Sequence, residues 1–88
     1  MSDTNWHVYI VECADRTLYT GVALNLSDRL DRHNDGSGAR YTRGRRPVRL
    51  VYAETAADRA AAQRREHAIK RLSADAKRRL IATAATAG

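Results

Sequence analysis

The stretch that decides the fold is residues 6–33, WHVYIVECADRTLYTGVALNLSDRLDRH. Residues 6–13 are rich in β-branched and aromatic side chains and predict a strand, and residues 18–22 predict a second one. Residues 14–17 lie between these two segments and predict a tight return. We therefore expect an antiparallel β-hairpin at the start of the chain.

The length of the return decides whether Tyr9 and Tyr19 share a face of the sheet, since facing residues of paired strands point the same way. A two-residue turn would place Cys13 opposite Leu18 and the two tyrosines on opposite faces. A three-residue loop, residues 15–17, would place Cys13 opposite Tyr19 and both tyrosines on one face. Turn frequencies slightly favour the shorter turn, so the residues alone leave both registers open.

A helix is expected directly after the hairpin, with Ser27 as its N-cap and an end near Asn34. Arg29 and His33 fall beside its apolar stripe, so we expect them at the edge of the sheet. Residues 36–46, GSGARYTRGRR, come next and are rich in glycine and arginine. They predict a mobile surface loop.

The rest of the chain predicts one more strand and two helices. A third strand follows Pro47, with its side chains alternating strictly between two faces over residues 48–53. Residues 55–72 are rich in Ala and Arg and predict a helix, and Ser73 is a good N-cap for a final helix to about Thr83. The order β-β-α-β-α-α predicts a small α+β domain with a three-stranded, mainly antiparallel sheet flanked by helices.

The length of 88 residues predicts one domain, residues 1–88, with its core at about 6–83. The single cysteine, Cys13, excludes an internal disulfide, and no apolar run reaches the ~20 residues of a membrane span. We find no signal-peptide pattern either. We therefore expect a cytoplasmic protein without a membrane partner, as a monomer or a weak homodimer.

The net charge of +6 belongs to the second half of the chain. Residues 1–35 carry three arginines against six acids, whereas residues 36–88 carry thirteen Lys or Arg against four acids. A basic surface of this kind favours phosphate-bearing partners through salt-sensitive attraction. Solubility and genome composition explain the charge at least as well, so charge alone permits a nucleic-acid partner without requiring one.

Glu66 is the most informative residue outside the opening stretch. Helical spacing places it between Ala62 and Ile69, on an apolar stripe that Leu72 continues. A half-buried carboxylate costs free energy unless a partner compensates it, and a divalent cation with oxygen ligands is one such partner. An ion pair with Arg29, Arg65 or Lys70 is the other, and spacing alone leaves the two open.

The ordered set of these residues resembles the GIY-YIG nuclease superfamily, which is named after two tripeptides on paired strands. Here the tripeptides read His7-Val8-Tyr9 and Tyr19-Thr20-Gly21, and the matching later residues are Arg29, His33 and Glu66. The chain looks like a small stand-alone, single-domain bacterial member. In this family both tyrosines line one site, so the resemblance implies the hairpin loop of odd length.

Two positions depart from the family pattern. His7 stands where the first tripeptide has glycine, which is tolerable if only the backbone matters there. The asparagine that many members place after the metal-binding Glu is missing, and Lys70 or Ser73 is the available substitute. This departure concerns the last contact to the phosphate or the metal, and with it the rate of catalysis.

The resemblance implies a divalent-metal-dependent DNA endonuclease that hydrolyses phosphodiester bonds, by nicking or by structure-dependent cleavage in DNA repair or processing. The implied catalytic residues are Tyr9, Tyr19, Arg29, His33 and Glu66. Tyr9 would be the general base, with Tyr19 as its competitor. Arg29 would clamp a phosphate oxygen, and His33 would orient a tyrosine or contact the phosphate. Glu66 would hold Mg²⁺ or Mn²⁺.

Duplex or structured DNA is the implied partner. The residues expected to contact it are the basic segment and one later lysine: Arg40, Tyr41, Arg43, Arg45, Arg46 and Lys70. Two other classes of function stay open, a nucleic-acid-binding module with a decayed or very slow nuclease site and an accessory domain that binds a protein partner. Salt-dependent binding of nucleic acid separates the last of these from the other two.

Overall fold

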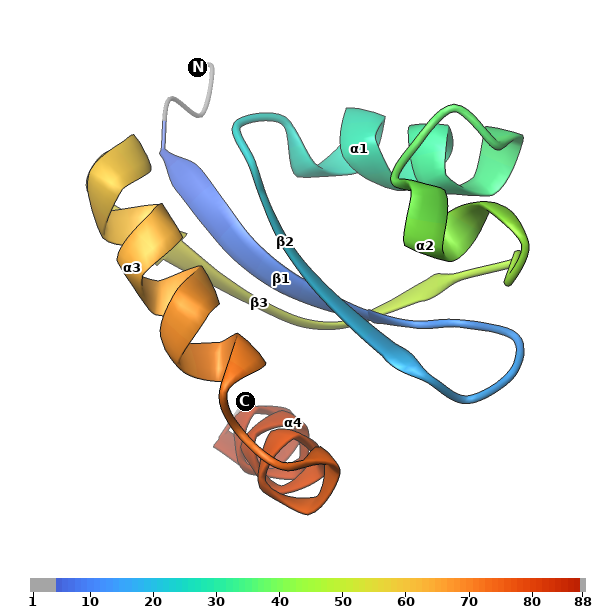
Figure 1. Cartoon of the computed structure of the whole chain (residues 1–88). Coiled ribbons are helices and arrows are strands. Elements are labelled where there is room, and N and C mark those ends of the chain that lie inside the picture. Colours follow the sequence, from blue (N-terminus) through green and yellow to red (C-terminus); the bar gives the residue numbers. More distant parts are fainter. Residues whose placement is uncertain (1–4, 88) are drawn as a thin grey trace.

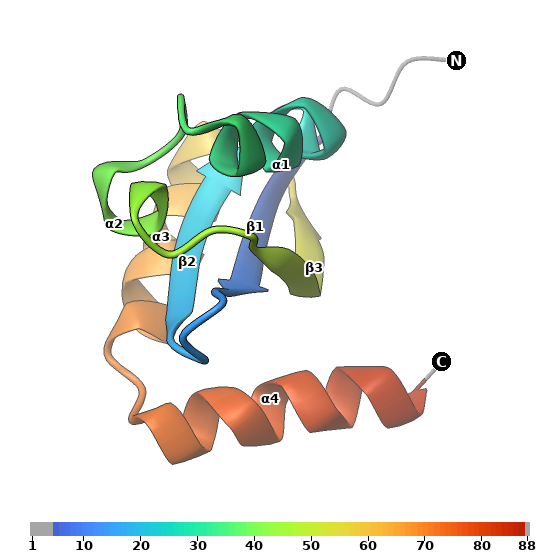
Figure 2. The same ribbon diagram turned by 90° about the vertical axis from the view of Figure 1, so that its right-hand side faces the viewer.

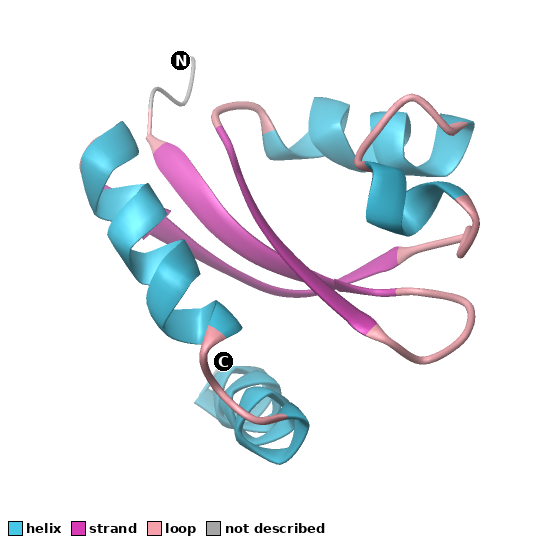
Figure 3. Ribbon diagram, in the orientation of Figure 1, coloured by secondary structure: helices cyan, strands magenta, loops and turns pink. Residues whose placement is uncertain are grey.

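A computed structural model describes residues 5–87 as a three-stranded antiparallel sheet with helices on both faces (Figure 1). In chain order the elements are β1 (Trp6–Glu12), β2 (Leu18–Ala23), α1 (Leu26–Asp35), α2 (Arg40–Arg43), β3 (Arg49–Ala56), α3 (Arg59–Lys70) and α4 (Ala74–Ala87). The predicted α+β class and the order β-β-α-β-α-α are confirmed, with one short helix, α2, added to them (Figure 3).

The middle strand of the sheet is β1, which pairs antiparallel with β2 on one side and β3 on the other. Helices α1 and α2 lie on one face of the sheet and α3 lies on the other (Figure 1). Helix α4 crosses the end of the sheet where the β1–β2 hairpin turns (Figure 2). Within residues 5–87 no helix has the length and apolarity that crossing a membrane requires.

Alternate residues of β1 enter two cores, which confirms the two faces predicted for this strand. Val8 and Ile10 pack with Ala62 and Ile69 of α3. The core on the α1 side contains Tyr9, Val11, Cys13, Ala23 and Val48, with Leu26 and Leu30 of α1 packed against it. Because each fully buried Val or Ile stabilises the fold by about 1.5–3 kcal/mol, both faces of β1 hold the sheet in place.

The β1–β2 hairpin has the predicted odd-length loop but a different register. Tyr19 lies opposite Val11 rather than Cys13, a shift of two residues. The Cys13 N–H donates to the Thr17 carbonyl at 2.8 Å, so the loop closes around residues 14–16 rather than 15–17. A left-handed φ of 72° at Arg16 permits this closure. A shift of two preserves the faces, and both tyrosines of the hairpin lie on the same side of the sheet.

Helix α1 begins two residues earlier than predicted because Asn25, not Ser27, is its N-cap. The Asn25 side chain accepts a hydrogen bond from the Asp28 N–H at 2.9 Å, so Leu26 is the first helical residue. Gly36 ends the helix with a φ of 92°, a left-handed conformation that favours glycine. The helix therefore has a firm cap at each end.

Helix α3 starts later than predicted, since β3 continues past residue 55. Asp58 is its N-cap and accepts from the Ala61 N–H at 2.8 Å. The predicted cap of α4 is confirmed: the Ala76 N–H donates to Ser73 Oγ at 3.1 Å. Strand pairing with β1 thus overrides the helical propensity of the residues just before Asp58.

A β-bulge in β3 makes the predicted strict alternation of this strand wrong. Ile10 pairs with Tyr52, but the next residue, Val11, pairs with Leu50, so Val51 has no partner of its own. Val51 and Tyr52 therefore both pack against the core on the α3 side. Leu50 faces the other way and is exposed.

Candidate active site

Three side chains form a buried hydrogen-bonded chain between the sheet and the helices α1 and α2. Tyr9 Oη lies 2.7 Å from His33 Nε2, and His33 Nδ1 lies 2.9 Å from Thr42 Oγ1. Thr42 Oγ1 donates to the Ala39 carbonyl at 3.0 Å. Tyr9 is 1% exposed and His33 and Thr42 are 0% exposed, so water does not compete for these bonds.

The direction of each hydrogen bond in this chain follows from Thr42. A threonine hydroxyl has one hydrogen, which here goes to Ala39, so Thr42 Oγ1 accepts from His33 Nδ1. His33 then carries its hydrogen on Nδ1, and its bare Nε2 accepts from the Tyr9 O–H. Burial, together with the charge of Arg29, lowers the pKa of His33 and keeps its ring neutral at neutral pH.

Two glycines let this chain fit against the backbone. A Cβ at Gly21 would lie 2.6 Å from Tyr9 Oη, and a Cβ at Gly38 would lie 2.7 Å from His33 Nδ1. Side chains do not tolerate contacts this short. The glycine of the second tripeptide therefore makes room for the phenol of the first.

A stack of rings holds α2 against the same chain. Tyr19 meets His33 edge-on, with ring centroids 5.4 Å apart, and Tyr41 stacks on Tyr19 at 5.8 Å. The Arg45 guanidinium lies 4.1 Å from the centroid of the Tyr41 ring. The prediction that residues 36–46 form a mobile loop is therefore wrong, because ring contacts and the buried Thr42 order the middle of this segment.

Arg29 and Glu66 act on the phenol through charge rather than through hydrogen bonds. Burial raises the pKa of Tyr9 most strongly, the charges of Tyr19 and Glu66 raise it further, and the charge of Arg29 lowers it. Arg29 is exposed on α1, and its guanidinium makes no hydrogen bond or ion pair with any side chain that the structure describes. This guanidinium is therefore available to an incoming anion.

Glu66 is half-buried on α3, with 14% of its side chain exposed, and its Oε2 lies 3.1 Å from Lys70 Nζ. The ion pair that spacing left open is thus present. Ala62 and Ile69 flank it in the core as predicted, whereas Leu72 lies beyond the end of α3 and is exposed. A carboxylate in this position has one cation as partner and its second oxygen available.

The Glu66 carboxylate suits a cation that takes few of its ligands from the protein. Among the described residues, no three His, Cys, Asp or Glu side chains gather where they could hold a metal ion. Mg²⁺ nevertheless keeps several waters and usually takes one or two carboxylates together with substrate phosphates. One half-buried carboxylate therefore suits a cation that the substrate helps to bind.

The arginines expected to contact DNA fall into two groups. Arg45 Nε donates to Asp15 Oδ2 at 3.0 Å, and Arg46 Nε donates to the Arg43 carbonyl at 2.9 Å, so both guanidiniums hold the segment together. Arg40 and Arg43 have exposed side chains that form no hydrogen bond or ion pair with another described side chain. Of these four arginines, only Arg40 and Arg43 have guanidiniums that could bind an anion without giving up a bond within the described part of the chain.

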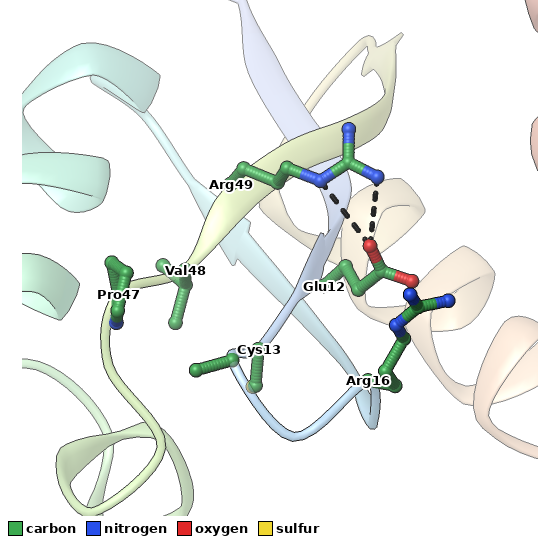
Figure 4. Close-up of a pocket in the computed structure, with 7 residues that line it drawn as sticks. Glu12, Cys13, Arg16, Pro47, Val48 and Arg49 are labelled. Carbon is green, nitrogen blue, oxygen red and sulfur yellow. Dashed lines mark hydrogen bonds and ion pairs between the residues drawn. The ribbon is translucent and has the colours of Figure 1, made fainter.

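A hollow at the far end of β1 lies apart from this constellation (Figure 4). On its wall Glu12 binds Arg49 at 2.8 Å and Arg78 at 3.1 Å, and these hydrogen bonds lower the pKa of Glu12. The other lining residues are Cys13, Ala14, Arg16, Pro47, Val48 and Arg49. The Glu12 carboxylate already joins β1 to β3 and α4 through these two ion pairs. The hollow therefore offers no unpaired carboxylate for chemistry.

Direct contacts thus join three of the predicted catalytic residues, and the remaining two reach Tyr9 through charge. Tyr9 and His33 are closed off from solvent, so neither of them lines an open cleft. Thr42 and Gly38 were not predicted. Both lie in the segment expected to be mobile, where no periodicity marks a buried position, and the glycine itself was the only signal of a close approach.

Comparison with known proteins assigns a family to this constellation. A model of the GIY-YIG catalytic domain matches residues 5–79. A UPF0213 protein of Desulfotalea psychrophila is 58% identical over 77 residues, which are 86% of this chain and 70% of that protein. A UPF0213 protein of Natronomonas pharaonis is 51% identical over 76 residues, which are 86% of this chain and 89% of that protein.

A solved structure agrees with these sequences. The solution NMR structure of the UPF0213 protein BH0048 from Bacillus halodurans covers 90% of this chain and 84% of its own, at 40% identity and a TM-score of 0.59. The span matched by the family model contains both tripeptides and all the later residues of the constellation. The chain therefore belongs to the GIY-YIG family, whose catalytic domain is of the nuclease type, and is similar to the small UPF0213 proteins.

Proposed function

We propose that the protein is a divalent-metal-dependent endonuclease that hydrolyses phosphodiester bonds in duplex or structured DNA. The Tyr9–His33 pair carries the proposal: a buried phenol donates to the bare Nε2 of a neutral imidazole at 2.7 Å. A proton therefore moves from oxygen to nitrogen across one short hydrogen bond. Membership of the family supplies the class of reaction in which such a pair is useful.

Tyr9 is the general base of the proposal, acting together with His33. A free phenol titrates near ~10, and burial raises the pKa of Tyr9 further, so a standing phenolate is not the base. Tyr9 instead gives its proton to His33 Nε2 while its oxygen takes a proton from the attacking water. The water oxygen bonds to phosphorus, and the bond from phosphorus to the leaving oxygen breaks. The negative charge of the bound phosphate raises the proton affinity of His33 and favours this transfer.

Arg29 stabilises the negative charge that develops on the phosphate during the reaction. Its exposed guanidinium lies close enough to the buried pair to shift the pKa of both Tyr9 and His33. A planar guanidinium binds two phosphate oxygens at once, which also fixes the orientation of the phosphorus. Removal of one such donor from a reacting centre typically costs about 10²–10³ in rate.

Glu66 would hold the divalent cation, together with water and a phosphate oxygen. When bound, Mg²⁺ or Mn²⁺ would neutralise charge on the leaving oxygen. Lys70 pairs with Glu66 at 3.1 Å and serves as the counter-ion of this carboxylate before the substrate arrives. Its flexible ammonium then becomes available to the DNA backbone.

A second candidate is a nucleic-acid-binding module with a very slow site. The burial of Tyr9 and His33 favours it, since the attacking water must reach a phenol that is 1% exposed. Tyr19, which is half-buried and packs on His33, would then compete as the base because it lies nearer to solvent. The two candidates differ in whether wild-type protein cleaves DNA at a measurable rate.

A cleavage assay separates the candidates. Purified protein is incubated with supercoiled plasmid and with branched DNA in Mg²⁺, Mn²⁺ or a chelator, beside Tyr9→Phe and Tyr19→Phe proteins purified in the same way. We expect metal-dependent nicking by the wild type, and a loss on the order of 10²–10⁴ in rate for Tyr9→Phe. Binding without cleavage would support the binding module, and a larger loss for Tyr19→Phe would move the base to that residue.

A further inference from the structure

Thr42 is the one polar side chain that α2 places in the interior. It is 0% exposed and bonds to two groups, accepting from His33 Nδ1 at 2.9 Å and donating to the Ala39 carbonyl at 3.0 Å. A valine would fill nearly the same volume without a hydroxyl to satisfy. The two hydrogen bonds are therefore what distinguishes threonine at this position.

We propose that Thr42 is a positioning residue that holds His33 as the Nδ1–H tautomer and so leaves Nε2 free to take the proton of Tyr9. The tautomer of a histidine is set by the bond that its other nitrogen makes. With the hydrogen on Nε2, the ring would donate to Tyr9 Oη, and Tyr9 could no longer pass its proton to His33. Thr42 thus decides whether Tyr9 or His33 is the donor of the hydrogen bond between them.

The surroundings of Thr42 fix this arrangement before any substrate binds. The Ala39 carbonyl is a backbone acceptor and cannot reverse its role, so the Thr42 hydrogen is committed to it. The absence of a Cβ at Gly38 lets the His33 ring lie close against the chain just before α2. The stack of Tyr41 on Tyr19 holds α2 in place. α2 therefore acts as part of the site although it contributes no group to the chemistry itself.

The tautomer is measurable without any enzyme assay. In ¹⁵N-histidine-labelled protein the protonated and bare ring nitrogens give separate NMR signals, and a His33→Gln sample assigns His33 among the three histidines. We expect a protonated Nδ1 in the wild type and in Thr42→Ser, which keeps the hydroxyl, and a protonated Nε2 in Thr42→Val. A wild-type ring protonated on Nε2 would overturn the proposal even if Thr42→Val failed to fold, as would a Thr42→Val ring unchanged from the wild type.

The effect of Thr42 on catalysis rests on the proposed function, so the nicking rate is measured separately from the tautomer. Single-turnover nicking, at a temperature where circular dichroism shows each variant folded, should fall on the order of 10²–10⁴-fold in Thr42→Val. Thr42→Ser should restore the rate to within about tenfold, because its hydroxyl makes the same two bonds. Wild-type protein that never nicks DNA would defeat the proposed function while the NMR result still decided the tautomer. Full nicking by Thr42→Val with a reversed tautomer would overturn the positioning role.

Discussion

Replacing Gly21 by alanine perturbs the closest approach in the site. A Cβ at this position would lie 2.6 Å from Tyr9 Oη and 2.8 Å from Tyr9 Cζ, whereas ordinary contacts begin at 3.4 Å. The phenol oxygen must therefore retreat by roughly 0.8 Å, the difference between 2.6 and 3.4 Å. Because that oxygen is 2.7 Å from His33 Nε2, the retreat breaks or lengthens the hydrogen bond between them.

The expected loss of stability has three contributions. Overpacking a core costs about 1–3 kcal/mol, and leaving a buried polar group without its partner costs about 1–3 kcal/mol more. Alanine is favoured over glycine within a strand by about 0.5–1 kcal/mol, which offsets part of this cost. We expect a net loss of about 1–5 kcal/mol in the free energy of unfolding, and a fall in Tm of at least about 5 °C for a domain of this size.

Urea and thermal unfolding of Gly21→Ala measure this loss, with Gly44→Ala as the matched control. Apart from its neighbours in the chain, a Cβ at Gly44 would meet no residue within 4 Å, so the control should stay within about 0.5 kcal/mol of the wild type. Nicking by folded Gly21→Ala should also fall, since its phenol no longer bonds to His33. If Gly21→Ala unfolds together with the control and nicks normally, the close packing of Tyr9 against Gly21 is absent in solution.

Three further predictions test the charges of the site. Arg29→Gln should lower the nicking rate about 10²–10³-fold while changing stability by less than about 0.5 kcal/mol, because the guanidinium is exposed; an unchanged rate would remove Arg29 from the site. Changing Arg40 and Arg43 together to Gln should weaken DNA binding and reduce the salt slope by up to about 0.9 per lost duplex phosphate contact, and an unchanged slope would show that neither contacts DNA. Burial lowers the pKa of His33 in the folded state, so the unfolded chain takes up a proton first as pH falls below about 6.5, and stability should decrease there in urea titrations. This decrease should be smaller in His33→Gln, and equal pH dependence in both proteins would contradict a buried neutral His33.

The first half of the fold was predictable because its signals are local. The apolar run of β1 and the alternation of its side chains follow from burial on both faces. The shared face of Tyr9 and Tyr19 needed the resemblance to the family, since turn frequencies favour the other parity. The predicted register was wrong by two residues, because the left-handed backbone of Arg16 closes the loop early. An arginine rarely adopts this conformation, so its residue type does not predict it.

The second half was less predictable because tertiary contacts override local preference. The glycine- and arginine-rich segment around α2 has no periodic apolar face, yet ring stacking on Tyr41 and the buried hydroxyl of Thr42 order it. The bulge at Val51 depends on how β3 pairs with β1, and no residue type marks it. Glu66 was placed correctly by helical spacing, whereas an ion pair was one of two open alternatives to its role and Lys70 one of three candidate partners.

The most direct test of the proposed nuclease is the Glu66→Gln variant. Glutamine keeps the shape of the side chain but removes the charge that would bind the cation, and Lys70, whose side chain is 49% exposed, can be solvated when it loses this ion pair. The measurement is the single-turnover nicking rate of supercoiled plasmid in Mg²⁺, for wild type and for Glu66→Gln shown to be folded by its melting curve. The proposed mechanism predicts that nicking collapses while DNA binding in a chelator persists. Normal nicking by well-folded Glu66→Gln protein would contradict it.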